Sequence, residues 1–320
     1  CIDVDDPTYS TANWTNIDSW ASFSLNCNPI YGCTDSTALN FDPLADTDDG
    51  SCTYPMTYVP DDNFEQALIN LGYDNVLDDS VLTASIETIS YLNVGWLNIY
   101  DLTGIEDFTA LTYLDCSYNY ITSLDVSGFT ALIGLLCNDN NIPNLSLSTN
   151  TALILLSCGY NQLTSLDVST NTALGSLDCS DSYNQFTSLD VSNNLALTHL
   201  YCAGNQITSL DLSNNLALTL LWCENNTLTS LDVRNGNNIN LTNFKAGNNP
   251  NLYCVNVDDP TWSTANWTNI DPWAYFSLNC NPIYGCTDST ALNFDPLADT
   301  DDGSCTYAGC TDSLACNYDP

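Results

Sequence analysis

The chain has 320 residues, of which 39 are acidic, two are Lys or Arg and one is His, so its formal net charge is −37. This balance excludes nucleic-acid binding and adhesion to an anionic membrane surface, because both need Lys and Arg, and no apolar run approaches the ~20 residues of a transmembrane helix. Apolar residues form 44% of the chain and aromatic residues 11%, which is enough to build a packed core and argues against disorder.

A long duplication links the two ends of the chain. Residues 1–54 recur at 254–307 with five differences, and residues 309–320 begin a third copy of the motif that starts at residue 32. This pattern predicts that the chain is a window cut from a longer tandem array. A single internal duplication is the alternative.

Cysteines in the duplicated segments keep their spacing. Each copy holds one widely spaced pair followed by one more closely spaced pair, and both spacings are identical in the two copies. Identical spacings, in modules too small to build a sufficient apolar core, predict disulfides. The four predicted bridges are Cys1–Cys27, Cys33–Cys52, Cys254–Cys280 and Cys286–Cys305. Cys310 falls in the slot of Cys33, so we expect its partner beyond residue 320, and Cys316 has no assigned partner.

The loop between the two cysteines of each closer pair also encloses a dense set of oxygen side chains, five Asp and one Asn within fifteen residues. So many carboxylates repel one another unless salt or a cation screens them, and Ca²⁺ takes about six to eight oxygen ligands. We therefore expect calcium as a cofactor, although a solvated acidic linker is the alternative. The predicted ligands are Asp35, Asn40, Asp42, Asp46, Asp48 and Asp49 in the first loop, and Asp288, Asn293, Asp295, Asp299, Asp301 and Asp302 in the second. The loops are not EF-hands, because Ala45 and Thr47 occupy ligand positions.

A short helix is predicted after the first module. Asp62 and Glu65 form a capping-box pattern, Phe64 and Leu68 share one helix face, and Gly72 suits the end of the helix.

The middle of the chain is built from successive copies of one frame, L-x-x-L-x-C-x-x-N-x-L-T-S-L-D-V-S-x-N-x-A. Its apolar positions point inward, and no single repeat can bury them alone, so the turns must stack and contribute one short parallel strand each. Six cysteines share one inward slot, where thiols are more often core hydrophobes than ligands. They are Cys116, Cys137, Cys158, Cys179, Cys202 and Cys223, with a two-residue insertion near Asp181.

Residues 89–257 resemble the leucine-rich repeat (LRR) family, in the short bacterial variant in which both half-repeats read L-x-x-L-x-[LVC]. The resemblance implies a mainly β solenoid with a short N-terminal cap helix, flanked by small disulfide-bonded Asp-rich modules, and a structural role for the asparagine that follows each cysteine. The caps resemble those of secreted Bacteroidetes LRR surface proteins, and the acidic loops loosely resemble calcium-binding thrombospondin type 3 repeats.

This resemblance implies a sequence of domains along the chain. They are the C-terminal cap of a preceding LRR domain (1–31), a Cys/Asp-rich calcium module (32–54), an LRR N-terminal cap (55–88), the solenoid (89–253), its C-terminal cap (254–284), a second Cys/Asp-rich module (285–307) and the start of a further module (308–320).

Two rows of outward side chains are candidates for function. The first strand of the repeat presents an apolar and aromatic set, and exposed patches of this kind mark contact sites, unless a neighbouring module covers them. The predicted contact face is Leu136, Leu155, His199, Tyr201, Leu220 and Trp222. The second half-repeat carries a row of aspartates that Ser146 interrupts. We favour hydrogen bonds from flanking serines, such as Ser123 and Ser165, over a row of cations.

The sequence does not indicate an enzyme, because it has one His, no G-x-S-x-G elbow and no phosphate loop. The leading hypothesis is a structural repeat unit of a long extracellular stalk, adhesin or fibre, stiffened by disulfides and calcium. The alternative is an LRR binding module that captures a glycan or protein ligand on its strand face. The resemblance implies a secreted or cell-surface protein. Its expected partners are copies of itself or neighbouring modules, without nucleic acid and without membrane insertion in this window.

Overall fold

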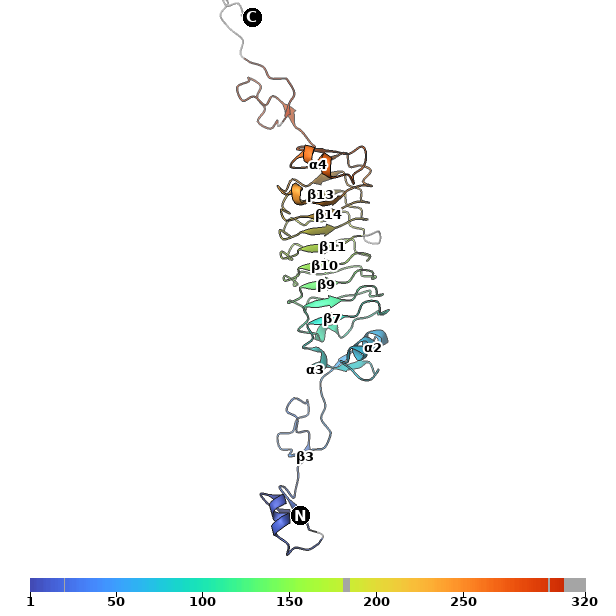
Figure 1. The fold of residues 1–320 in the computed structure, drawn as a ribbon, viewed down its shortest axis with the longest axis vertical. Coiled ribbons are helices and arrows are strands. Elements are labelled where there is room, and N and C mark those ends of the chain that lie inside the picture. Colours follow the sequence, from blue (N-terminus) through green and yellow to red (C-terminus); the bar gives the residue numbers. More distant parts are fainter. Residues whose placement is uncertain (20, 181–184, 299, 308–320) are drawn as a thin grey trace, which may run out of the picture. The chain divides into compact units, whose positions relative to one another are not determined.

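The computed structural model describes residues 1–19, 21–180, 185–298 and 300–307 (Figure 1). The chain divides into two compact units, Cys1–Ser90 with Asp101–Ala110, and Tyr91–Tyr100 with Leu111–Pro320. Within the described ranges, no helix is both long enough and apolar enough to span a bilayer. The start of a further module expected at 308–320, the insertion near Asp181 and the predicted ligand Asp299 lie outside these ranges.

The first unit begins with a small disulfide-closed segment. Its two strands, β1 (Ile2–Asp3) and β2 (Phe23–Ser24), pair in parallel. Helix α1 (Pro7–Asn13) lies between them in sequence, and the Asp6 carboxylate caps it by accepting the Tyr9 N–H at 2.9 Å. Trp14 packs edge-on against Phe23, with 5.5 Å between ring centroids. The acidic loop that follows contains the parallel pair β3 (Tyr31–Gly32) and β4 (Thr47–Asp48).

The predicted cap helix forms as α2 (Asp62–Leu71), with its cap one residue earlier than expected. Asp61, not Asp62, accepts the N–H groups of Asn63 and Phe64, each at 3.0 Å. Glu65 does not complete a capping box. Its fully buried carboxylate accepts backbone N–H groups from Asp78, Asp79 and Ser80 at 2.8–3.1 Å, so it fixes the segment that enters the next strand.

Four further elements belong to the first unit. They are the antiparallel strands β5 (Met56–Tyr58) and β6 (Ser80–Leu82), the helix α3 (Thr83–Ile86) and the 3-10 helix η1 (Ile105–Asp107). Phe64 of α2 is fully buried and stacks on Phe108, with 6.3 Å between centroids. Gly72 ends α2 in the left-handed conformation with φ of 83°, as the sequence predicted.

The second unit is built around an eight-stranded parallel sheet with one strand for each of eight turns (Figure 1). Its strands are β7 (Tyr91–Asn93), β8 (Tyr113–Asp115), β9 (Gly134–Leu136), β10 (Leu155–Ser157), β11 (Ser176–Asp178), β12 (His199–Tyr201), β14 (Leu220–Trp222) and β16 (Asn243–Lys245). All pairs are in register, and the middle residue of every strand is buried. The predicted strand in each turn is therefore confirmed.

In the last turns, the second half-repeats form a smaller parallel sheet of four strands. Its strands are β13 (Ser209–Asp211), β15 (Ser230–Asp232), β17 (Cys254–Asn256) and β18 (Tyr275–Ser277). The 3-10 helix η2 (Asn238–Asn240) and the helix α4 (Pro260–Asn266) belong to the same end of the solenoid. Trp267 stacks on Phe244 with 4.3 Å between centroids and donates its indole N–H to the Leu241 carbonyl at 2.9 Å, so it closes the end of the core. The pair β19 (Tyr284–Gly285) and β20 (Thr300–Asp301) lies in the second acidic loop.

The core of the solenoid depends on a ladder of buried asparagines as well as on leucines. Asn161 is representative: its amide donates to the carbonyls of Cys137 and Cys158 at 2.9 and 3.2 Å, and its Oδ1 accepts the Ile142 N–H at 3.0 Å. Each such side chain joins two turns and satisfies backbone groups that would otherwise be buried unpaired. The predicted ladder is confirmed, with members Asn119, Asn140, Asn161, Asn205 and Asn226, and Asn249 continues it.

Candidate binding surfaces and Asp-rich modules

All four predicted disulfides are present, with Cα–Cα distances of 5.4, 4.8, 5.7 and 4.8 Å in chain order. The six cysteines of the repeat are instead free thiols buried in the core. Burial raises the pKa of the Cys137 thiol to about 12. A thiol held neutral in this way is a poor nucleophile and metal ligand, so the cysteine ladder packs the core as expected.

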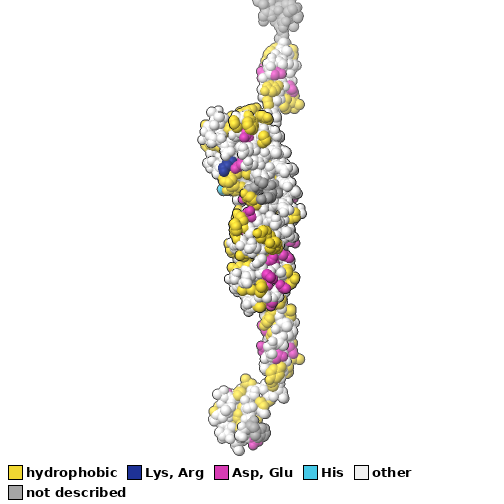
Figure 2. Space-filling model, turned by 90° about the vertical axis from the view of Figure 1, so that its right-hand side faces the viewer, with side chains coloured by type: hydrophobic (Ala, Val, Ile, Leu, Met, Phe, Trp, Pro, Cys, Tyr) yellow, Lys and Arg dark blue, Asp and Glu magenta, His cyan; other side chains and the backbone are white. Residues whose placement is uncertain are grey.

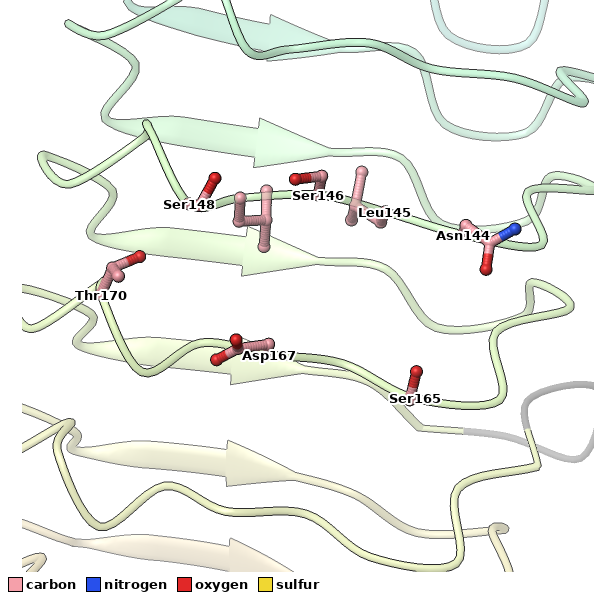
Figure 3. A pocket seen from close by; sticks show the side chains of 8 residues that line it. Asn144, Leu145, Ser146, Ser148, Ser165, Asp167 and Thr170 are labelled. Carbon is pink, nitrogen blue, oxygen red and sulfur yellow. The ribbon is translucent and has the colours of Figure 1, made fainter.

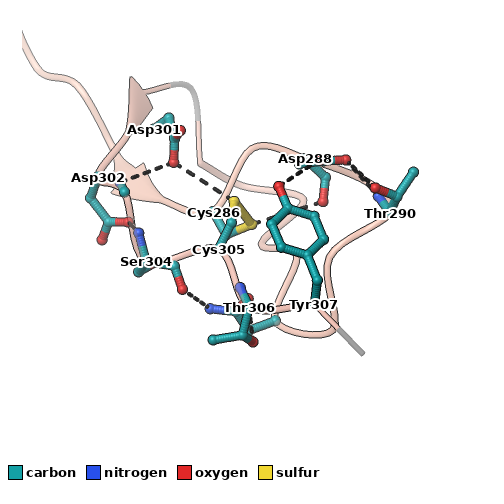
Figure 4. Close-up of a disulfide and its surroundings, with 11 residues drawn as sticks. Cys286, Asp288, Thr290, Asp301, Asp302, Ser304, Cys305, Thr306 and Tyr307 are labelled. Atoms are coloured by element: carbon teal, nitrogen blue, oxygen red, sulfur yellow. Dashed lines mark hydrogen bonds between the residues drawn. A yellow bond between two sulfur atoms is a disulfide. The ribbon is translucent and has the colours of Figure 1, made fainter. Parts of the chain in front are cut away.

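The two acidic loops are closed by their side chains as well as by a disulfide. In the first, the Asn40 amide donates to the Ser51 carbonyl at 2.7 Å and accepts the Thr53 N–H at 2.8 Å. In the second, the Tyr307 hydroxyl donates to Asp288 at 2.8 Å beside the Cys286–Cys305 bridge (Figure 4). The same bonds recur in the other copy, at Asn293 and at the Tyr54–Asp35 pair.

The predicted calcium ligands that the structure describes are engaged in local hydrogen bonds. Asp42, Asp48 and Asp49 each accept the backbone N–H of the residue two positions ahead, at 2.9, 3.1 and 2.9 Å. Asp46 accepts the Ile30 N–H at 3.0 Å and is also bonded by Asn26. In the described part of the chain, no group of three or more His, Cys, Asp or Glu side chains is placed to hold a metal ion.

The second loop repeats this arrangement at the positions that the structure describes. Asp295, Asp301 and Asp302 accept N–H groups two residues ahead at 2.9–3.1 Å. Thr290 donates its N–H and its hydroxyl to Asp288, and these bonds hold the pKa of that carboxyl below its usual value. Each loop is thus held by local turns, and calcium binding stays a prediction.

The aspartates of the second half-repeat are also paired differently from the prediction. Asp125, Asp167 and Asp190 accept backbone N–H groups from the serines two residues after them, each at 2.9 Å, rather than bonds from the serines that precede them. These bonds lower the pKa of all three carboxyls. Where Ser146 interrupts the row, a hollow of about 240 Å³ opens between two turns (Figure 3).

The predicted contact face lies on the strands but is divided in two. Leu136 and Leu155 lie at opposite ends of the adjacent strands β9 and β10. On β12 and β14, His199 pairs with Leu220 and Tyr201 pairs with Trp222. The polar strand β11 separates the two groups, and all six side chains are half-buried rather than exposed.

Trp222 is the centre of the second group. Its ring packs edge-on against Tyr201, with 5.0 Å between centroids, and the Lys245 Nζ lies 3.4 Å above its centre. Its indole N–H donates to the Asn243 side chain at 3.0 Å, and Glu224 faces Lys245 at 4.0 Å. The face of this ring is therefore already covered by a cation of the same chain.

More strongly exposed aromatic rings, which were not among the predicted contact residues, lie on the loops after the first strands. Trp96 is 70% exposed and stacks on Tyr118 with 3.6 Å between centroids, and Tyr100 stacks on Tyr120 with 4.9 Å. Tyr118 and Tyr120 occupy the second and fourth positions after Cys116, on either side of the ladder asparagine. That spacing was the signal that could have revealed them.

The in-register parallel sheet, the inward cysteine slot and the asparagine ladder define the fold. This is a leucine-rich repeat solenoid. No protein-family model and no curated protein sequence matches the chain. Solved structures to which it is similar include three bacterial LRR proteins.

The functional domain of InlJ from Listeria monocytogenes, which includes a cysteine ladder, is 31% identical with a TM-score of 0.42. That match covers 65% of this chain, and the chain spans 58% of that one. An internalin (inlF) of the same organism is 22% identical, with a TM-score of 0.47 and coverage of 76% and 77%. The LRR protein LIC12759 of Leptospira interrogans is 20% identical, with a TM-score of 0.41 and coverage of 60% and 50%.

Proposed function

We propose that the chain is a repeating structural unit of an extracellular protein, in which disulfide-closed acidic modules space and display LRR solenoids as a stalk, adhesin or fibre. The observation that carries this proposal is the duplicated module. In both copies a disulfide joins two cysteines at the same sequence separation, with a Cα–Cα distance of 4.8 Å. The same hydrogen bonds of Asn and Tyr side chains form inside each loop. A loop that is closed by the same bonds in both copies is suited to act as a repeated spacer between solenoids.

The composition of the modules supports the same role. In the first loop only Cys33 and Ala38 are buried apolar residues, so the disulfide and the Asp turns replace a hydrophobic core. Disulfides persist in oxidising surroundings, and their presence supports a role outside the cytosol. The large negative charge keeps neighbouring copies apart unless salt or cations screen it.

Limited digestion with proteinase K tests the role of the bridges. The solenoid has no described disulfide within 89–253, so a reductant should open only the modules and caps. We expect new cuts within 28–55 and 281–307 after reduction, with a resistant fragment over the solenoid. The double substitution Cys33→Ser and Cys52→Ser should reproduce the first set of cuts without reductant. Equal resistance in oxidised and reduced protein would contradict a disulfide-held spacer.

Calcium belongs to this proposal as a stiffening ion of the acidic loops. Since the carboxylates are already bound in local turns, the ion would have to recruit their remaining oxygens by a rearrangement of the loop. We expect Ca²⁺ to raise the melting temperature relative to a chelator at constant ionic strength, because a ligand of the folded form alone stabilises it. If melting is unchanged and no heat of binding is measured, the loops are acidic spacers without a metal.

Ligand capture on the strand face is a second candidate function, favoured by the cluster of Tyr201, Trp222 and Lys245. Aromatic and cationic side chains grouped on adjacent strands suit the recognition of a glycan or protein. An oligosaccharide array should then show binding that the double substitution Tyr201→Ala and Trp222→Ala abolishes. The matched control is Tyr253→Ala, which removes an exposed ring outside the face. Binding that survives the double substitution would exclude this face.

A further inference from the structure

A row of residues crosses the loops after strands β8 to β10 and combines two rings with a carboxylate. Tyr118, Asp139 and Tyr160 each stand two residues after a ladder cysteine, in three successive turns. The Tyr118 N–H donates to the Asn138 carbonyl at 2.9 Å, and the Asp139 N–H donates to the Gly159 carbonyl at 3.0 Å, so these turns are direct neighbours. Asp139 therefore occupies the place of a ring between two tyrosines.

The short Asp139 side chain leaves space on both sides. One hollow of about 320 Å³ is lined by Trp96, Asn98, Tyr118, Asn119, Tyr120 and Asp139. An adjoining hollow of about 220 Å³ is lined by Asn119, Tyr120, Asp139, Asn140, Asn141, Tyr160 and Gln162. Since Trp96 covers one face of Tyr118, the other face of that ring is directed to the turn of Asp139.

We propose that the space between the rings of Tyr118 and Tyr160, which we name the Asp139 slot, binds the guanidinium group of an arginine side chain from a basic partner. The guanidinium would lie against the Asp139 carboxylate. Adjacent turns are roughly 4.8 Å apart, so a group at the level of Asp139 lies about 5 Å from each ring. A cation contacts a ring face within about 6 Å of its centre. A planar cation with a carboxylate beside it satisfies both kinds of contact at once.

The protein has no cation of its own for this slot. Its two basic side chains are both engaged in the C-terminal turns, Arg234 with Asp232 at 3.0 Å and Lys245 with Trp222 and Glu224. On the face shown in Figure 2, Lys and Arg lie over those turns, whereas Asp and Glu gather among hydrophobic side chains over the N-terminal turns. The cation must therefore come from another molecule, and a net charge of −37 attracts it.

Lys245 shows that this chain already uses the same chemistry. Its Nζ lies 3.4 Å above the Trp222 ring, with a Glu224 oxygen at 4.0 Å. The slot at Asp139 has the ring and the carboxylate of that arrangement without the cation. The Asp139 carboxylate accepts the Asn138 amide at 3.0 Å, and burial, the charge of Asp139 and a side-chain hydrogen bond to Asp139 raise the pKa of Tyr118.

The backbone of this row is left-handed, as it is at the same position of other described turns, for example at Trp96 and Asn248. Tyr118, Asp139 and Tyr160 have φ values of 56°, 54° and 52°, in the left-handed region. The equivalent position is Gly204 and Asn225 in later turns, residues that adopt this conformation more readily. The conformation therefore belongs to the repeat itself, and what these turns add is the bulky ring of Tyr118 or Tyr160, placed against the local backbone preference.

The test uses a peptide with a single arginine, acetyl-Gly-Arg-Gly-amide, and its neutral citrulline counterpart, with the whole chain in saturation-transfer NMR at low salt. We expect the arginine peptide to bind with a millimolar dissociation constant and the citrulline peptide to show no binding. Asp139→Asn keeps a residue that tolerates the left-handed backbone, and should weaken binding at least fivefold. Tyr160→Ala should do the same.

Matched variants separate the slot from the general negative charge. Asp190→Asn removes the same charge from an exposed position, and Tyr253→Ala removes an exposed ring elsewhere. Both should bind the arginine peptide within twofold of the unaltered protein, and thermal melting checks that every variant is folded. Equal binding of the citrulline peptide, unchanged binding by Asp139→Asn, or an equal loss with Asp190→Asn would each overturn the proposal.

Discussion

Removing one member of the asparagine ladder should destabilise the solenoid far more than the loss of an ordinary surface asparagine. Asn161 is fully buried, donates to three carbonyls at 2.9–3.2 Å and accepts the Ile142 N–H at 3.0 Å. Asn161→Ala leaves that N–H without its partner inside the core, whereas the Cys137 carbonyl loses one of its two bonds and keeps the one from the Asn140 amide. The substitution also removes bonds that join two adjacent turns.

The size of the effect follows from these bonds. A neutral hydrogen bond contributes about 1 kcal/mol net, and a buried donor left unpaired costs about 1–3 kcal/mol. The donor lost at Ile142 and the best of the three carbonyl bonds together give a loss of roughly 2–4 kcal/mol in the free energy of unfolding. With a urea m-value of about 2–3 kcal/mol/M, the midpoint should fall by roughly 1 M.

Urea unfolding followed by tryptophan fluorescence measures this loss. The matched control is Asn193→Ala, an exposed asparagine in the same repeat frame, which should change the free energy of unfolding by less than about 0.5 kcal/mol. A loss below about 1 kcal/mol for Asn161→Ala, at an unchanged m-value, would refute the bonding role that we assign to the ladder.

Further substitutions and reagents test separate parts of the structure. Hydrogen bonds from Thr37 and Tyr54 lower the pKa of Asp35 in the folded module. The ionised carboxylate therefore stabilises the folded module at a pH above the pKa that Asp35 has in the unfolded chain. This contribution is lost as the pH falls through the lower pKa of the folded module. The hydrogen bond to Asp35 raises the pKa of Tyr54, so Asp35→Asn should return the pKa of Tyr54 toward its usual value in an NMR titration of ¹³C-labelled tyrosine. An unchanged Tyr54 titration curve would show that this hydrogen bond does not form. Glu65→Gln should cost about 1–3 kcal/mol in urea unfolding, because a charged acceptor of three N–H groups is lost, and a neutral result would contradict that role. The six ladder thiols should resist iodoacetamide in native protein and react fully in urea, since burial raises their pKa; rapid native labelling by mass spectrometry would show an accessible ladder.

Features that depend on the repeat period were predictable, because only one stacking satisfies every turn at once. The strand at Leu156, the inward thiol of Cys158 and the bonding of Asn161 all follow from side chains that recur once in every turn and cannot be buried by one repeat alone. The disulfides were predictable for a similar reason, since the duplicated segments preserve both cysteine spacings.

Features that depend on a local choice between two partners were not predictable. An aspartate followed by a serine or glycine two positions later suits a metal site and a backbone turn equally well, and Asp48 and Asp49 adopt the turn. Asp61 and Asp62 can both cap a helix, and Glu65 is drawn away by the chain at residues 78–80. The rings of Tyr118 and Tyr160 were not predictable from the alternation of strand positions, because they stand beside the ladder asparagine where the backbone is left-handed.

Electron microscopy of the native material tests most directly whether solenoids are joined one after another by the disulfide-closed modules. If solenoids are spaced by disulfide-closed modules, images should show elongated particles of uniform length joined by thin connections at regular intervals. Reduction should increase the spread of angles at those connections and leave the particles unchanged, because the solenoid core holds no described disulfide. Single, separate particles in native samples, or connections that reduction does not affect, would contradict the spacer role.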